Sequence, residues 1–209
     1  MIEIITNLIQ MLFSGICAWV ALRRAVRAKS REWSLLALFF ASFAFADLYW
    51  LLYLLFFRMT PKYFFLSDLI WYVSFLFLLL LLQYIKGDRR EMYRSRLSWI
   101  GPVIAAGMCV FYMRWGDYFS NIISACLMGI LLWRAIGGLV YLHNRPKEET
   151  RARYFLIITL IFCLLEYALW TVSCFWMGDT MANPYFWFDL LITGCMLLFL
   201  PALGKAVAD

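Results

Sequence analysis

Seven long apolar stretches alternate with short polar segments along this chain. Each stretch is close to, or longer than, the about 20 residues that an α-helix needs to cross the hydrocarbon core of a bilayer. The pattern therefore predicts an all-α, polytopic membrane protein whose single domain covers residues 1–209. The predicted transmembrane helices cover residues about 4–22, 33–57, 63–85, 97–113, 119–142, 154–177 and 184–203.

Composition supports this class and narrows the function. Hydrophobic residues make up 65% of the chain, charged residues make up 15%, and the mean hydropathy is +0.78. Soluble domains are far less apolar than this. The apolar stretches occupy nearly the entire sequence, which leaves no room for a soluble catalytic or DNA-binding domain. The six cysteines all lie within apolar stretches, so neither a disulfide framework nor a cysteine metal site is indicated.

Sequence motifs for common catalytic chemistry are not found. The single histidine, His143, lies in a polar segment, and the chain has neither an HExxH motif nor a phosphate-binding glycine loop. We therefore expect no enzymatic activity, no cofactor and no metal site. An intramembrane hydrolase that uses two acids as general acid and base is the third and least favoured hypothesis.

Lysine and arginine are distributed unequally between the two sides of the predicted helices. Only Arg58, Lys62 and Arg114 lie in the second and fourth polar segments. By the positive-inside rule, the N-terminus of this cell-membrane protein is outside and its C-terminus is cytoplasmic. The basic segments also suit anionic lipid head groups, and we expect no nucleic-acid partner. The basic residues on the predicted inner side are Arg23, Arg24, Arg27, Lys29, Arg31, Lys86, Arg89, Arg90, Arg94, Arg96, Arg145, Lys147, Arg151, Arg153 and Lys205.

Short sequence matches indicate an internal repeat. "GICAWVAL" (15–22) matches "GILLWRAI" (129–136), "ADLYW" corresponds to "LEYALW", and "SDLIW" corresponds to "FDLLI". Three helices, one linker helix and three further helices would place the two units in the same orientation, a plan found in transporters. The predicted boundaries are about 4–85 for repeat one, about 97–113 for the linker helix and about 119–203 for repeat two.

Four carboxylates interrupt the apolar stretches, namely Asp47, Asp68, Glu166 and Asp189. At 1.5 Å per residue, Asp68 and Asp189 lie roughly 8 Å, and Asp47 and Glu166 roughly 15 Å, below the predicted outer helix ends. Aromatic residues follow them at helical spacing, which places rings and carboxylates on one helix face. We expect the deeper pair to carry charge or a proton and the shallow pair to form an entrance. The expected ligand-binding residues are Asp47, Trp50, Asp68, Trp71, Tyr72, Glu166, Trp170 and Asp189.

Two interpretations of these acids remain open. A charge that faces lipid is so costly that the acids should face the bundle interior or a hydrated cavity, where indole and phenol rings would help to hold a cation. Alternatively, the acids tie helices together through hydrogen bonds, or, at Asp68 and Asp189, are favoured by the helix dipole. One further charge, Arg134, is expected to form an ion pair with Glu166 or to extend to the inner interface.

Three families resemble parts of this pattern. Seven predicted helices with the N-terminus outside, Asp68 in the third and Asp189 of "FDLLITG" in the seventh resemble microbial rhodopsins. Thr193 stands where the retinal lysine belongs, so no Schiff base can form. The segments "ALRRAVRAKSREWSLLALFFASFAFADLYWLLYLL" and "LIWYVSFLFLLLLLQYIKG" resemble the seven-helix membrane input region of bacterial sensor histidine kinases, which implies ligand sensing. The three-plus-one-plus-three plan resembles SWEET and PQ-loop transporters, although the stretches contain no Pro-Gln pair.

The sequence therefore favours a sensor or receptor module with an outward-facing acidic and aromatic cavity for a small cationic or aromatic ligand. The alternative is a proton- or cation-coupled secondary transporter of a small solute. A transporter needs polar groups below the acids, and the sequence offers only Arg134, Ser42 and Ser74 there. Expected partners are the lipid bilayer, a small-molecule ligand, and a cytoplasmic signalling protein or a second copy of the chain.

Overall fold

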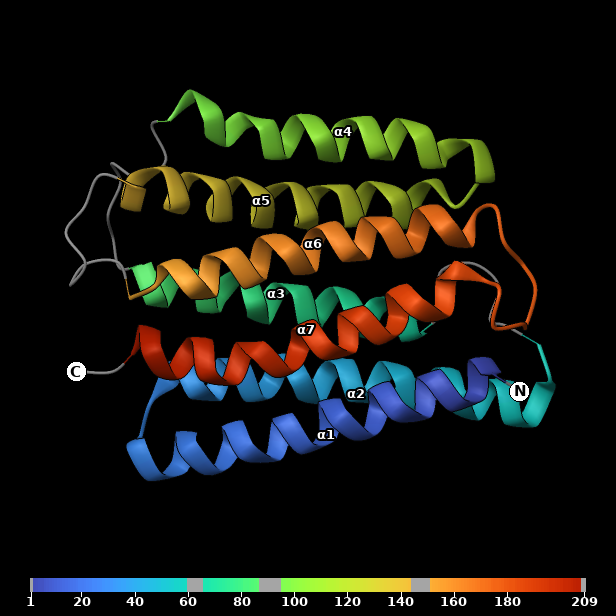
Figure 1. Cartoon of the computed structure of the whole chain (residues 1–209), viewed down its shortest axis with the longest axis horizontal. Coiled ribbons are helices and arrows are strands. Elements are labelled where there is room, and N and C mark those ends of the chain that lie inside the picture. The colour runs from blue at the N-terminus through green and yellow to red at the C-terminus, as the bar shows by residue number, and fades with distance from the viewer. Residues whose placement is uncertain (1, 60–65, 87–94, 144–150, 208–209) are drawn as a thin grey trace.

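The computed structural model describes residues 2–59, 66–86, 95–143 and 151–207, and its regular elements there are all helices. Seven helical segments, of which the fourth is Arg96–Trp115, are long and apolar enough to cross a membrane. This confirms the predicted all-helical fold and is consistent with a multi-pass membrane protein. The seven segments run alternately up and down along one axis (Figure 1). The helices are α1 (Ile2–Ala28), α2 (Arg31–Phe57), α3 (Leu66–Lys86), α4 (Ile100–Tyr112), α5 (Tyr118–His143), α6 (Arg153–Ser173) and α7 (Pro184–Ala206), and short 3-10 helices, η2 (Arg96–Trp99) and η3 (Met113–Trp115), flank α4.

Local chemistry sets several helix ends. Lys29 adopts a left-handed conformation with φ 50°, which ends α1 because a residue with positive φ cannot continue a right-handed helix. The next residue, Ser30, accepts a hydrogen bond on its hydroxyl from the backbone N–H of Trp33 and so caps α2. Asn183 caps α7 in the same way, with Pro184 at the first helical position.

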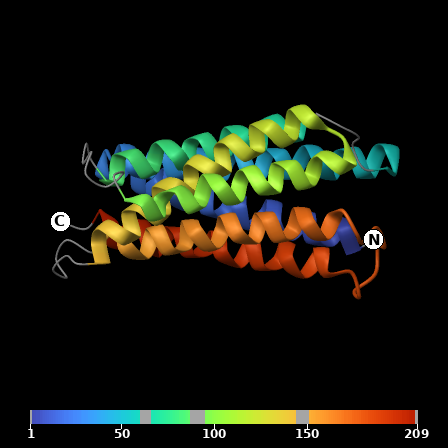
Figure 2. The ribbon, with the colours of Figure 1, turned by 90° about the horizontal axis from the view of Figure 1, so that it is seen from above.

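Six of the helices form a closed ring. Around this ring α1 contacts α2, α2 contacts α3, α3 contacts α5, α5 contacts α6, α6 contacts α7, and α7 contacts α1 again. Helix α4 lies outside the ring and packs on α5 (Figures 1 and 2). This close approach requires Gly101, because a Cβ there would lie 2.7 Å from both Cβ of Leu132 and the backbone nitrogen of Trp133.

Phenylalanine side chains fill the middle of the ring. Phe39, Phe162 and Phe199 are fully buried, and their ring centroids lie 5.6–5.8 Å apart with edge-to-face geometry. Phe43 and Phe75 contact Phe162 from the side of the bundle where α1 begins. We call these five residues the phenylalanine plug. The plug separates the two ends of the bundle.

Candidate functional site

A cavity of about 480 Å³ opens into the bundle at the end where α1 begins. Its floor is formed by Phe43 and Phe75 of the phenylalanine plug. All six helices of the ring contribute to its walls, together with Tyr112 of α4, the α4–α5 connection and the loop between α6 and α7. The volume is within the usual range of small-molecule sites.

Three carboxylates converge beside this cavity, and we call Asp47, Glu166 and Asp189 the deep acids. Their side chains are 0%, 4% and 3% exposed. Asp47 lies within electrostatic range of both Asp189 and Glu166, and Glu166 lies within range of Asp189. Each retains one buried oxygen without a hydrogen-bond partner in the described structure: Oδ2 of Asp47, Oε1 of Glu166 and Oδ2 of Asp189. Because buried polar atoms are nearly always paired, these oxygens are an unusual feature.

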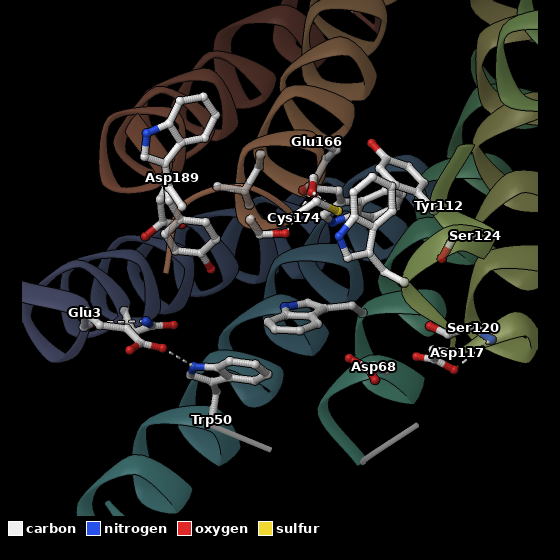
Figure 3. Close-up of a pocket in the computed structure, with 18 of the residues that line it drawn as sticks. Glu3, Trp50, Asp68, Tyr112, Asp117, Ser120, Ser124, Glu166, Cys174 and Asp189 are labelled. Atoms are coloured by element: carbon white, nitrogen blue, oxygen red, sulfur yellow. Dashed lines mark hydrogen bonds between the residues drawn. The ribbon is translucent and has the colours of Figure 1, made fainter. Parts of the chain in front are cut away.

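Two indole rings of the cavity wall donate hydrogen bonds to carboxylates. Nε1 of Trp71 donates a hydrogen bond to Oδ1 of Asp47 over 3.3 Å. Nε1 of Trp50 donates to Oε1 of Glu3 over 3.2 Å (Figure 3). The two ring centroids lie 5.6 Å apart with their planes at 42°. Each of the two indole N–H groups therefore donates a hydrogen bond to a carboxylate.

A second acidic group lies at the mouth of the cavity, and we call Asp68 and Asp117 the rim acids. Asp68 is half-buried in the first turn of α3, and Asp117 directly precedes α5. Oδ1 of Asp117 accepts a hydrogen bond from the backbone N–H of Ser120 over 3.3 Å, and the Ser120 hydroxyl is hydrogen-bonded to that of Tyr72. Figure 3 shows Asp68, Asp117 and Ser120 together, on the side of the cavity away from Asp189.

Hydrogen bonds of Tyr112 join α4 to the wall of the cavity. Its hydroxyl donates to the backbone oxygen of Tyr167 over 3.0 Å and lies 2.8 Å from the hydroxyl of Thr171. Trp170 meets the Tyr112 ring edge-on, with centroids 6.4 Å apart. Although α4 is outside the ring, it therefore supports one face of the site.

The charged side chains in the described lining of the cavity are acidic. Its described lining residues include no lysine, arginine or histidine. Among the described residues no group of three or more His, Cys, Asp or Glu side chains is arranged to hold a metal ion. Carboxylates and aromatic faces are both groups that attract positive charge. The acidic lining residues are Glu3, Asp68, Asp117, Glu166, Asp179 and Asp189.

The structure brings together most of the residues that the sequence singled out. Seven of the eight expected binding residues line the cavity, and Asp47 lies behind Trp71 instead of on the surface of the cavity. Burial does not follow the two predicted tiers of depth. Asp189 is buried with Asp47 and Glu166, five residues into α7, whereas Asp68 lies at the mouth, in the first turn of α3.

Several lining residues were missed. Glu3, Asn7 and Gln10 of α1 face the cavity, and their spacing of four and three residues would have indicated one polar helix face. The first helix was expected to begin at residue 4, but α1 begins at Ile2 and includes Glu3 in its first turn. The sixth helix ends at Ser173 instead of residue 177, so the loop that follows contributes Asp179 to the wall.

The helix positions weigh against the predicted ion pair of Arg134 with Glu166. Arg134 is sixteen residues from the start of α5 at Tyr118, and Glu166 is seven residues from the end of α6 at Ser173. At 1.5 Å per residue these depths differ by about 13 Å. The charged group that acts on Glu166 is another acid, Asp189. The depths of the two residues do not favour the ion pair, which stays a prediction.

Comparisons of the chain with models of protein families, with curated protein sequences and with solved structures found no match. The resemblances to sensor-kinase input regions, microbial rhodopsins and SWEET or PQ-loop transporters therefore stay expectations.

Proposed function

We propose that this protein is a membrane receptor or sensor module that binds a small organic cation in the acidic, aromatic cavity. One observation carries the proposal: Glu166 and Asp189 line the cavity, are almost fully buried, and each keep an oxygen without a partner in the described structure. A cation in the cavity would supply the missing partner.

The cost of burial explains why such a site would be selective for positive charge. Isolating a carboxylate from water costs several kcal/mol unless a partner compensates it. The described lining offers no basic side chain, so the compensating charge would come from a proton or from the ligand. The faces of Trp50 and Trp71 add cation–π attraction of about 0.5–2 kcal/mol.

The distribution of basic residues supports an outward-facing cavity. Among the described residues, Arg27, Arg31 and Arg153 lie at the end of the bundle opposite the cavity, where α1 ends and where α2 and α6 begin. By the positive-inside rule that end is cytoplasmic and the cavity faces the exterior. The cytoplasmic end would then offer basic residues such as Arg27 and Arg31 to a signalling partner.

The phenylalanine plug favours sensing over transport. Below the cavity the ring is filled by fully buried apolar side chains, including Phe39, Phe162 and Phe199. A solute would have to displace these rings to reach the other end. A sensor that binds the solute without transporting it needs no such movement of the rings.

A secondary transporter is the second candidate, and the position of α4 favours it. A helix outside the ring between α1–α3 and α5–α7 fits a linker between two parallel three-helix repeats. That plan occurs in transporters. On this hypothesis the phenylalanine plug is a closed gate.

The proposal is tested by comparing a cation with an uncharged molecule of the same shape. Purified protein in lipid nanodiscs is titrated with choline and with its carbon isostere dimethylbutanol, and quenching of tryptophan fluorescence reports occupancy. We expect choline to bind at least about tenfold more tightly, and Glu166→Gln to remove most of this preference. The control is Glu32→Gln, an acid at the opposite end of the bundle, which should leave the preference unchanged. Equal binding of the two compounds would contradict the proposal.

A further inference from the structure

We propose that the ligand is a primary amine whose protonated nitrogen donates hydrogen bonds to both Glu166 and Asp189. This inference rests on the proposed cation-binding function and names the class of cation, one that carries N–H groups instead of a quaternary nitrogen. It follows from two buried oxygens that lack a donor, from the closeness of the two acids, and from the use of neighbouring donors elsewhere in the protein.

Two buried acceptors of the cavity are without a donor. No described residue donates a hydrogen bond to Oε1 of Glu166 or to Oδ2 of Asp189. The two side chains are only 4% and 3% exposed, and both line the cavity. Thr6 and Gln10 lie beside Asp189, and its Oδ2 still has no partner. A buried charged acceptor without a donor is costly, so a ligand that brings donors gains more than one that brings charge alone.

The two acids lie at nearly the same depth on neighbouring helices. Glu166 is seven residues, or about 10 Å, from the end of α6, and Asp189 is five residues, or about 8 Å, from the start of α7. The two helices pack against each other, and Asp189 acts electrostatically on Glu166. Figure 3 shows both acids on the side of the cavity away from Trp50. One nitrogen between the two acids can therefore donate to both.

Three donors of the cavity wall are already used within the protein. The indole N–H groups of Trp50 and Trp71 donate to the carboxylates of other residues. The hydroxyl of Tyr112 donates to a backbone oxygen of α6. Donors from a ligand would complete Glu166 and Asp189 without breaking any of these bonds.

An ammonium group matches the two oxygens, whereas a quaternary nitrogen does not. Two of its three N–H groups can donate to Glu166 and Asp189, and Gln10, which also lines the cavity, offers a carbonyl oxygen for the third. N-methyl groups offer no such donors and hold the nitrogen away from the carboxylate oxygens. Quaternary nitrogen is typically held by cages of aromatic faces, whereas here carboxylates that lack a donor face the cavity.

The experiment removes the N–H groups of one ligand step by step. Ethanolamine, N-methylethanolamine, N,N-dimethylethanolamine and choline all carry one positive charge at neutral pH, and they have three, two, one and no N–H groups on the nitrogen. Their affinities for the full chain in nanodiscs are measured by isothermal titration calorimetry. We expect affinity to fall along the series, with ethanolamine at least about tenfold tighter than choline, because hydrogen bonds between charged groups are the strong ones.

Two variants assign the preference to the two acids. Glu166→Gln and Asp189→Asn each replace a charged acceptor by a neutral amide, so each should reduce the preference for ethanolamine over choline several-fold. The acids lie on different helices, so either variant serves as the test if the other does not fold. Glu32→Gln, at the opposite end of the bundle, is the matched control and should leave all four affinities unchanged.

The outcomes separate this inference from the function on which it rests. Equal affinities along the series, or tighter binding of choline, would overturn the primary-amine inference and leave cation binding intact. An undiminished preference for ethanolamine in the folded variants would also overturn it, because the N–H groups would then be recognised elsewhere. Failure of all four compounds to bind would overturn the proposed function itself.

Discussion

Trp71 donates its indole N–H to Oδ1 of Asp47 over 3.3 Å, and this bond joins the most buried of the described carboxylates to the wall of the cavity. The bond crosses from α3 to α2. It satisfies one oxygen of Asp47, while Oδ2 has no partner in the described structure. Trp71 thus has two roles: its N–H stabilises a buried acid, and its ring forms a face of the binding site.

Removal of this hydrogen bond should destabilise the protein. Trp71→Phe keeps an aromatic ring but leaves Oδ1 of Asp47 without its donor, which should cost about 1–3 kcal/mol of unfolding free energy. In the Asp47→Leu background the carboxylate that accepts this hydrogen bond is absent, so the same change should cost much less. A double-mutant cycle of unfolding free energies measures the difference. Additive effects of the two substitutions would contradict this role of Trp71.

The packing of α4 on α5 should be sensitive to one methyl group. Gly101→Ala introduces a Cβ within 2.7 Å of the backbone of α5, so we expect a loss of about 1–3 kcal/mol of stability. Gly107→Ala is the matched control in the same helix, because its Cβ would meet nothing within 4 Å. Thermal unfolding in one detergent compares the two variants. Equal melting temperatures would show that α4 does not pack as described.

Much of the fold and part of the site follow from the sequence alone. The seven helices follow from the lengths of the apolar stretches, because the bilayer imposes that length on any spanning helix. Asp47 and Glu166 were placed deep because each lies far from a polar segment. Asp189 was placed at the entrance because it lies only five residues from the start of α7. Its burial depends on tertiary contacts that this short distance does not reveal.

The remaining features depend on tertiary contacts that no single stretch encodes. The closed ring with α4 outside it depends on which helix faces pack together, and apolar residues on all sides of a membrane helix do not specify this. Glu3 was missed because an acid two residues from the chain start was assigned to the segment before the helix. Its bond to Trp50 joins positions 47 residues apart.

The phenylalanine plug predicts binding without passage. Proteoliposomes that contain the wild-type protein should bind radiolabelled choline but should not accumulate it, with or without a proton gradient. The reason is that Phe39, Phe162 and Phe199 close the ring below the cavity. Empty liposomes provide the control. Saturable uptake that Glu166→Gln abolishes would contradict the sensor hypothesis and favour the transporter.

The pH dependence of the reaction of Cys174 should show that its thiol is partly buried. It lies in the cavity wall just after α6, and its Sγ donates a hydrogen bond to the backbone oxygen of Trp170. Burial raises the pKa of the Cys174 thiol. Because the thiolate is the reactive form, the rate of its modification should keep rising with pH beyond the range of an exposed cysteine. A pH–rate profile with the ordinary pKa of a free cysteine, about 8.5, would contradict this environment.

The most direct test of the central claim is the sign of the charge that the cavity admits from outside. Intact cells are treated with cationic and anionic methanethiosulfonate reagents of similar size, and the Cys174→Ser variant identifies the part of the reaction that belongs to Cys174. If the cavity is hydrated, outward-facing and acidic, the cationic reagent should modify Cys174 at least about tenfold faster, and choline should slow the reaction. Equal rates for the two reagents, or modification only after the cells are broken open, would contradict the account.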